Sequence, residues 1–367
     1  MSADGSLSRP SKNNRQAPRE SLSRQDEGTE PSDLPDGTPL RPISVEAGRQ
    51  LRDEAVMELT DGMRARPWYS VVDEWRDWYE SYLNSHIEFE GPDGETVRTE
   101  LENSYMPKYG RRYYGKLKDL ERGIERECES LTTVMLTFTA SNRNAEGGYR
   151  CPADHMRDIM DGYDAARKQV HQVLSGLNWE YARVWEPHKS GYGHLHMAIF
   201  VEADDLDAER FRPVMDSHVR NCDPAGSEAH TLENAVSVNN DVNNLGTYIS
   251  EYIGIFGEQP TERPMTEQMF YAVAWATNTR RVDFSNGAHD LMAREQFRRE
   301  TGLRPEERGG EAFDEWRGTD GTGSDWSVDS ICSVPGRHPD YADPTTGGVD
   351  TAVIDGRAGV DPPPTVE

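Results

Sequence analysis

Two histidines in the segment Trp179–Glu202 (WEYARVWEPHKSGYGHLHMAIFVE) are separated by a single residue. Aromatic and branched residues on either side of a polar, glycine-containing turn indicate two strands, with His194 and His196 in the second. Side chains alternate between the faces of a strand, so both imidazoles should point the same way while Leu195 faces the core. Neutral imidazole is a common metal ligand, so this pair could share one metal ion.

Glu186 ends the first of these strands, and the turn folds it back toward His194. One carboxylate and two imidazoles, with other positions left open, suit Mg²⁺ or Mn²⁺ better than a closed structural zinc site. The alternative is that the histidines are ordinary polar residues on the solvent face of a half-buried strand. The acidic neighbour favours the metal site, so we expect Glu186, His194 and His196 to bind Mg²⁺ or Mn²⁺.

The segment GHLHMAIFV resembles the His-hydrophobe-His motif of the HUH endonucleases, the initiators of rolling-circle replication. Two other blocks follow the order of that family. The strand LTTVMLTFTAS (Leu131–Ser141) resembles its first motif, and LGTYISEYIG (Leu245–Gly254) resembles its third, which carries the nucleophilic tyrosine. The segments YARVWEPHKSGYGHLHMAIFVE and YISEYIG are also similar to replication proteins of haloarchaeal plasmids and viruses. The ordered triplet is more specific than any of the motifs alone.

The third motif contains Tyr248 and Tyr252, whose spacing of four places both phenols on one face of a helix. The alternative is that both tyrosines pack in the core of an amphipathic helix. The resemblance implies that they are nucleophiles, as in initiators whose two tyrosines act in alternate strand transfers. That family often has a lysine three residues after the nucleophile, where this sequence has Glu251. Arg280 or Arg281 could provide the missing positive charge.

By this resemblance the chain is an enzyme, a plasmid or viral initiator that nicks and rejoins single-stranded DNA through a 5′-phosphotyrosine intermediate. Its partners would be single-stranded or origin DNA and the host helicase and polymerase, in the cytoplasm. The sequence has no GxxxxGK[ST] run that would indicate a fused helicase. Three alternatives stay open: a transposase or mobilisation relaxase, a metal-dependent hydrolase that uses water, and a non-catalytic DNA-binding regulator.

The charge balance argues against simple DNA binding, because the chain has 66 acidic residues against 40 Lys plus Arg and a net charge of −26. DNA-binding proteins are normally basic. A proteome adapted to molar salt would select such a surface, and at about 1 M salt the Debye length of roughly 3 Å screens repulsion from DNA phosphates. The same salt weakens binding by counterion release, so base contacts, stacking and the metal would contribute more.

Tyr105–Arg126 is the most basic run of the chain, and its tyrosines alternate with basic residues. Basic groups can hold phosphates, and tyrosines can stack on unpaired bases. The alternative, which is compatible with the first, is an amphipathic helix whose tyrosines pack on the core while the charges are solvated. We expect DNA contacts from Lys108, Arg111 and Arg112.

Two mirror-image pairs, Cys151 with His155 and His218 with Cys222, each have a spacing of four. Residues at this spacing share a helix face, so the four could hold a structural Zn²⁺ if the two segments meet. Nothing in the sequence requires that they meet. Four cysteines in 367 residues are too few for a disulfide framework and fit a reducing cytoplasm.

The predicted fold class is α+β, with a central antiparallel sheet that contains the His-x-His hairpin and is flanked by helices. Apolar periodicity predicts helices over 45–90, Pro152–Ser175 and Asp204–Val219, with a β-α-β-β order around the hairpin. The absence of about 18 consecutive apolar residues, and of an apolar core near the start, predicts neither a membrane span nor a signal peptide.

Composition divides the chain into four predicted parts. They are a disordered N-terminal tail (1–44), a helical N-terminal region (45–130), the endonuclease domain (131–300) and a disordered acidic C-terminal tail (301–367).

Overall fold

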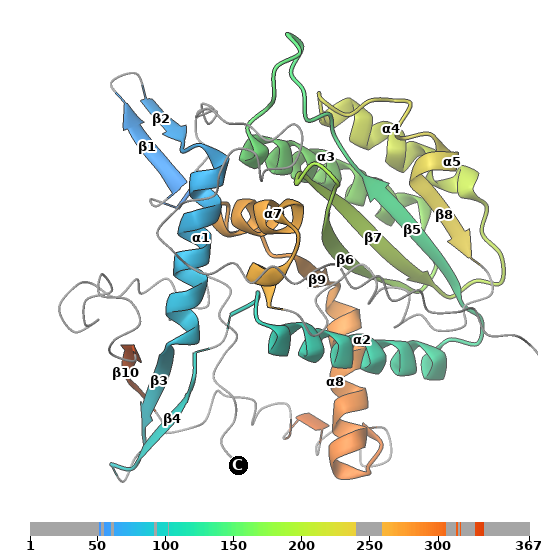
Figure 1. Ribbon diagram of the computed structural model, residues 1–367. Helices are drawn as coiled ribbons and strands as arrows, with labels where there is room; N and C mark the ends of the chain where they lie inside the picture. The colour runs from blue at the N-terminus through green and yellow to red at the C-terminus, as the bar shows by residue number, and fades with distance from the viewer. Residues whose placement is uncertain are drawn as a thin grey trace, which may run out of the picture.

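A five-stranded antiparallel sheet lies at the centre of the computed structural model (Figure 1). Its strand order is β8-β5-β7-β6-β9, which confirms the predicted α+β class with a central antiparallel sheet. The structure describes residues 51–52, 55–59, 62–91, 94–101, 103–239, 259–305, 313–314, 316 and 327–333. The five strands are β5 (Thr132–Phe138), β6 (Trp179–Pro187), β7 (Gly193–Val201), β8 (Val236–Asn239) and β9 (Val282–Phe284).

The central strands β5 and β7 are buried along most of their lengths, which explains the continuous apolar run at the end of β7 and the buried apolar residues Val134, Met135 and Leu136 of β5. Helix α3 (Pro152–Val173) connects β5 to β6, and a tight turn connects β6 to β7, so the predicted β-α-β-β order is confirmed. The register of the sheet places Glu186 opposite His194. It also places His196 between Val184 of β6 and Thr137 of β5.

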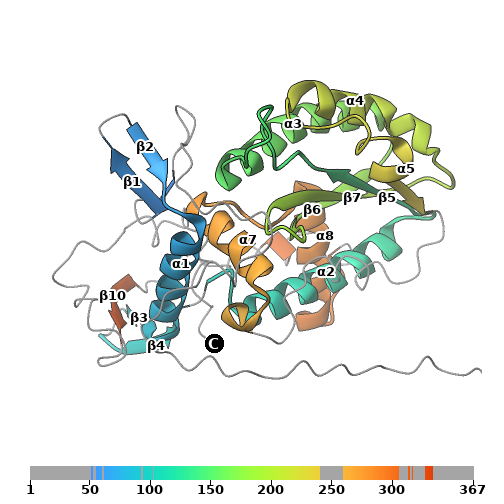
Figure 2. The same ribbon diagram turned by 45° about the horizontal axis from the view of Figure 1, so that its top comes forward.

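One face of the sheet is covered by α3 and α4 (Arg212–Asn221), as Figure 2 shows. Leu136, Leu195 and Met197 belong to this core. The two helices lie close together because α3 has a glycine at their contact. A Cβ atom on Gly162 would lie only 2.5 Å from the Nδ1 atom of His218.

The opposite face is covered by α2 (Pro107–Glu127) and α8 (Asn286–Thr301), which lie below the sheet in Figure 2. Leu117 and Leu120 of α2 pack there with Met135 and Phe200 of the sheet. A Cβ atom on Gly123 would lie 3.1 Å from the Cβ atom of Leu291, so this glycine permits the close approach of α8. The amphipathic helix predicted within 105–126 is therefore confirmed, with its apolar side on the sheet.

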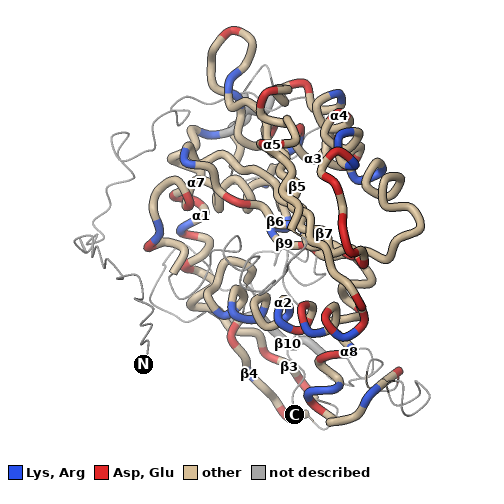
Figure 3. The backbone as a smooth tube through the Cα atoms, turned by 90° about the vertical axis from the view of Figure 1, so that its right-hand side faces the viewer, with Lys and Arg blue, Asp and Glu red and all other residues tan. Residues whose placement is uncertain are grey.

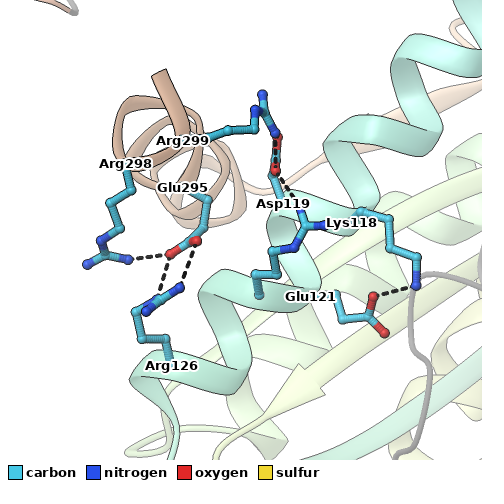
Figure 4. Close-up of polar contacts among 8 residues, drawn as sticks. Lys118, Asp119, Glu121, Arg126, Glu295, Arg298 and Arg299 are labelled. Atoms are coloured by element: carbon cyan, nitrogen blue, oxygen red, sulfur yellow. Dashed lines mark hydrogen bonds and ion pairs between the residues drawn. The ribbon is translucent and has the colours of Figure 1, made fainter. Parts of the chain in front are cut away.

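Buried carboxylates join α2 to α8 (Figure 4). Glu295 is 4% exposed and accepts two hydrogen bonds from Arg126, at 3.0 and 3.2 Å, and one from Arg298. Asp119 accepts bonds from Arg299 at 2.6 and 2.8 Å and from Arg122 at 3.1 Å. Each carboxylate thus bonds two guanidinium groups, which offsets the cost of burying it.

Substituting Glu295→Ala is expected to lower the free energy of unfolding by about 2–3 kcal/mol, because the change removes the buried carboxylate that bonds both Arg126 and Arg298. Chemical denaturation of the two proteins measures the difference. The control is Glu300→Ala, a change at an exposed glutamate of the same helix, with an expected effect within about 0.5 kcal/mol. Equal effects of the two substitutions would contradict a structural role for the buried pair.

Residues of the N-terminal region belong to the same hydrophobic core as the sheet. Helix α1 (Trp68–Leu83) packs against α7 (Met265–Ala276) through an aromatic cluster. Trp75 contacts Tyr105 and Tyr271, with ring centroids 5.9 and 5.8 Å apart. A boundary at residue 130 therefore does not divide the hydrophobic core. The described residues also form the short helical segments η3 (Ala208–Phe211), α5 (Leu232–Ala235) and η4 (Pro260–Glu262).

Two predictions about secondary structure need correction. The region predicted to be helical also contains strands β1 (Val56–Leu59), β2 (Gly62–Ala65), β3 (Ser85–Glu90) and β4 (Thr96–Glu100). The predicted disorder of 301–367 does not hold for β10 (Ser327–Ser333), which pairs with β3. Its stabilising partner is the main chain of a strand more than 200 residues away, so local composition gives no indication of it. The tail 1–44 lies outside the described residues.

None of the helices that the structure describes is long and apolar enough to cross a membrane.

Candidate metal centre

Three potential ligands converge at the ends of β6 and β7. The Nε2 atoms of His194 and His196 lie 3.2 and 3.0 Å from the same Oε2 atom of Glu186. Strand alternation puts both histidines on one side of β7, and the register brings Glu186 opposite the first. In the part of the chain that the structure describes, this is the one group of three or more His, Cys, Asp or Glu ligand atoms within 4.8 Å of one another.

The turn between β6 and β7 fixes this arrangement. Gly191 has a φ of 80°, a left-handed conformation that glycine adopts without strain. A Cβ atom there would also lie 2.8 Å from the Sδ atom of Met269. The Tyr192 hydroxyl donates a 2.7 Å hydrogen bond to the main-chain oxygen of Arg150, which attaches the turn to the segment before α3.

The protonation states suit metal binding at neutral pH. Burial alone would raise the pKa of Glu186, but hydrogen bonds from the two imidazoles lower this pKa to about 2. Burial lowers the pKa of His196, and this outweighs the opposing effect of Glu186. The site therefore presents an ionised carboxylate and a neutral His196 imidazole, which are the forms that bind metal ions.

The His196 ring is held by a residue that the sequence analysis missed. Its Nδ1 atom lies 3.1 Å from the hydroxyl oxygen of Thr137, which is its register partner on β5. Without a metal, the Nε2–H of neutral His196 bonds Glu186 and the Nδ1 atom can accept from this hydroxyl. With a metal bound, the other tautomer would donate its Nδ1–H to the hydroxyl and direct the Nε2 lone pair to the ion, a common arrangement around metal-binding histidines. The alternation of threonine with apolar residues in β5 was the available signal, but only the register identifies which threonine lies beside His196.

The three residues fit a Mg²⁺ or Mn²⁺ ion. Adjacent ligands of an octahedral ion with bonds of about 2.1 Å lie about 3 Å apart. The measured separations of 3.0 and 3.2 Å between Glu186 and the two imidazoles match this value. One carboxylate and two imidazoles would leave coordination positions open, as a catalytic site requires.

Arg280 and Arg281, the two arginines expected to replace the missing lysine, lie in different environments. Arg281 is buried, donates a hydrogen bond to the main-chain oxygen of Ser104 and lies 4.8 Å over the Tyr105 ring. The Arg280 side chain is 65% exposed and pairs with Asp283 at 3.3 Å. The Trp185 amide bonds the main-chain oxygen of residue 281, so Arg280 lies by the end of β6 that carries Glu186.

The predicted nucleophiles Tyr248 and Tyr252, together with Glu251, lie outside the described residues. Their predicted roles therefore stay predictions. The strand that precedes them in the chain is β8, which pairs with β5 at the edge of the sheet.

The four predicted zinc ligands do not form a metal site. The His155 Nε2 atom lies 2.9 Å from the Gly193 oxygen, and the His218 Nε2 atom lies 3.1 Å from the Thr139 oxygen. Both rings thus contact main-chain carbonyls, and Cys151 and Cys222 are buried and are not in a disulfide. The helices α3 and α4 do meet, as that prediction required, but the four side chains do not converge on one point.

Fold and site together define an α+β protein with a two-histidine, one-carboxylate candidate metal centre on an antiparallel sheet. Residues 43–317 match the family model described as "Putative rep protein (DUF1424)", and the chain belongs to this family of Rep-like replication proteins. The match spans most of the chain and includes all three candidate ligands.

Two haloarchaeal proteins are similar to this chain over most of their lengths. The "Uncharacterized 36 kDa protein" of Halobacterium salinarum is 36% identical over 285 residues, which cover 73% of this chain and 87% of the relative. A protein of the same description from Halobacterium sp. (strain GN101) is 31% identical over 293 residues, which cover 73% and 86%. No solved structure matches the chain.

Proposed function

We propose that this Rep-family protein initiates rolling-circle replication of a plasmid or virus by nicking and rejoining single-stranded DNA. The observation that carries the proposal is the convergence of Glu186, His194 and His196 on one point. The order of the three sequence motifs supports an HUH-type endonuclease, and membership of the Rep family supports a role in replication. The substrate would be single-stranded or origin DNA, with the host helicase and polymerase as cytoplasmic partners.

The proposed chemistry divides between the metal centre and a tyrosine. A divalent ion bound by Glu186, His194 and His196 would polarise the scissile phosphate and stabilise the charge that develops on its oxygens. The phenol oxygen of Tyr248 or Tyr252 attacks phosphorus and loses its proton to a base. The bond from phosphorus to the 3′-oxygen breaks, and this oxygen leaves as a 3′-hydroxyl after taking up a proton.

The ester linkage conserves the energy of the broken bond, so a later attack by a 3′-hydroxyl on the phosphotyrosine rejoins DNA without ATP. A phenol has a pKa near 10 in water, so the nucleophile needs activation. A nearby cation would favour the phenolate, and Glu251 would oppose it. Arg280 is exposed beside the metal end of β6, and we propose that it holds the phosphate there in place of the lysine common in the family.

The test is a cleavage assay on labelled single-stranded DNA that covers the origin of the replicon encoding this protein. Full-length protein in high KCl with Mn²⁺ is analysed on a denaturing gel for protein covalently joined to DNA. We expect an adduct with wild type and none with His194→Ala. We also expect that one of Tyr248→Phe and Tyr252→Phe reduces the adduct strongly, which would identify the nucleophile.

Other outcomes favour the alternative classes. Cleavage without an adduct would favour a hydrolase that uses water. DNA binding without cleavage by wild type, unchanged by the double Tyr→Phe variant, would favour a non-catalytic regulator. A covalent adduct formed only at transposon ends or a transfer origin would favour a transposase or relaxase with the same chemistry.

A further inference from the structure

The N-terminal half of α2 is strongly basic in a very acidic protein. Its first twelve residues (PKYGRRYYGKLK) contain five lysines and arginines and no acidic residue, while the whole chain has a net charge of −26. Figure 3 shows these basic positions following one another along α2. Positions that share the outward side of the helix form what we call the basic face. It comprises Lys108, Arg111, Arg112, Gly115 and Lys116.

The basic face contains two sequence features that destabilise an isolated helix. Lys108, Arg112 and Lys116 repeat at a spacing of four, where like charges repel. Gly115 lies in the helix interior, where glycine destabilises a helix relative to alanine. Both features oppose helix formation in the same part of α2. Residues that conflict with local helix propensity tend to occur at functional sites.

Among the residues that the structure describes, no packing contact explains Gly115. A Cβ atom built on this residue would meet no heavy atom within 4 Å among the described residues, and its φ is not in the left-handed region. Gly123 of the same helix is different, because Leu291 of α8 lies against it. No described neighbour requires a glycine here, so Gly115 leaves room among the surrounding cations for the close approach of an anionic ligand to the helix surface.

We infer that the basic face binds the sugar-phosphate backbone of duplex DNA, separately from the metal centre. The face points away from the sheet, whereas the candidate ligands lie on the sheet itself. Proteins that bind single strands combine cations with aromatic rings on which bases stack. Tyr105, Tyr109 and Tyr113 are instead buried, and Tyr114 is 37% exposed. The three buried tyrosine rings therefore cannot stack on bases, as the sequence had suggested. The exposed side of the helix presents basic side chains, which can contact phosphates.

This inference extends the proposed function by adding the duplex that flanks a nick site. Its test measures binding alone, without Mn²⁺ and without cleavage. Fluorescence anisotropy of labelled duplex, single-stranded DNA and RNA of one sequence is recorded for the full-length protein across a KCl series. The His194→Ala variant is included and should bind duplex like wild type, so failure of the nickase proposal would not affect this result.

The decisive variant is Gly115→Ala. Alanine favours the helix, so the melting temperature should rise by about 2 °C. The added methyl group should hold a phosphate farther from the neighbouring lysine and arginine side chains and weaken duplex binding roughly threefold to tenfold, as expected when one charge-assisted contact is weakened. A protein that becomes more stable and binds more weakly cannot be explained by misfolding.

Two further variants complete the design. Arg111→Gln should reduce the slope of log K against log salt by about 0.9, the effect of one phosphate contact. Gly226→Ala is the matched control, because a Cβ atom there also meets nothing among the described residues. Gly226 lies in the chain between α4 and α5, and α4 covers the face of the sheet opposite α2 (Figure 2), so this variant should bind like wild type. Unchanged duplex binding by both Gly115→Ala and Arg111→Gln would overturn the inference. The inference would also be overturned if these variants lost binding only to single-stranded DNA or only to RNA.

Discussion

Replacing His196 by alanine is expected to remove Mn²⁺ binding at the centre and to reduce adduct formation by more than about 100-fold. Loss of a residue that only supports a metal ligand already costs about 10- to 100-fold in affinity or activity. His196 is itself a candidate ligand, 3.0 Å from Glu186 and supported by Thr137. Isothermal titration with Mn²⁺ measures the first effect, and the denaturing gel measures the second.

His188→Ala is the matched control for this prediction. His188 lies exposed in the same turn, with its ring 6.2 Å from that of His194, but it is not part of the group of converging ligands. The His188→Ala variant should bind Mn²⁺ like wild type. If His196→Ala retained both metal binding and the adduct while the protein stayed folded, the metal centre described here would be the wrong site.

Acid is expected to destabilise the fold through its buried histidines. Burial lowers the pKa of both His155 and His218 to about 4, although main-chain carbonyls near both rings oppose the shift. Burial also lowers the pKa of His230, whose ring lies 4.7 Å from that of His218. His155 and His218 contact the main chain just after β5, so their protonation would disturb the edge of the core.

The sign of the effect follows from the difference between the pKa of each histidine in the unfolded chain and its pKa in the folded protein. Histidine in the unfolded chain has a pKa of about 6.5, so below that pH the unfolded state binds more protons than the folded state. The stability contributed by neutral His155 and His218 is fully present above about pH 6.5. It is lost as the pH falls toward 4. Each histidine would account for up to about 2 kcal/mol at pH 5 and about 3 kcal/mol in full.

Chemical denaturation at pH 7 and at about pH 5 measures this loss. In His155→Gln the difference between the two pH values should shrink by about 2 kcal/mol, because glutamine does not titrate. His171→Gln, a change at an exposed histidine of the same helix, should leave the difference unchanged. Identical pH dependence in wild type and His155→Gln would show that the buried imidazole does not carry the effect.

Local sequence determined the parts of this protein that depend on short-range geometry. Strand alternation and one short turn are enough to bring Glu186, His194 and His196 together, and the structure contains this triad. The β-α-β-β order and the apolar side of α2 followed from periodicity in the same way. These features need only neighbours in the chain, so their pattern is present in the residues themselves.

Tertiary structure decided what depends on distant partners. Thr137 could be matched to His196 only through the register of β5 with β7, and burial separated Arg281 from Arg280. The four residues proposed for zinc had suitable types and spacing. Their helices do pack together, but the rings turn to main-chain carbonyls instead. Spacing places side chains on a helix face without fixing the distance between two helices or the direction of each ring.

Dependence on distant partners also explains why the sequence did not predict β10 or single out Gly115. A weakly apolar segment becomes a strand because the edge of β3 offers it hydrogen bonds, and composition carries no information about that edge. A glycine in a helix is uninformative until its surroundings are known. Only the tertiary structure shows that α8 requires Gly123 and that no described part of the chain requires Gly115. The sequence thus determined which residues could do chemistry, while long-range packing decided which of them meet and which face outward.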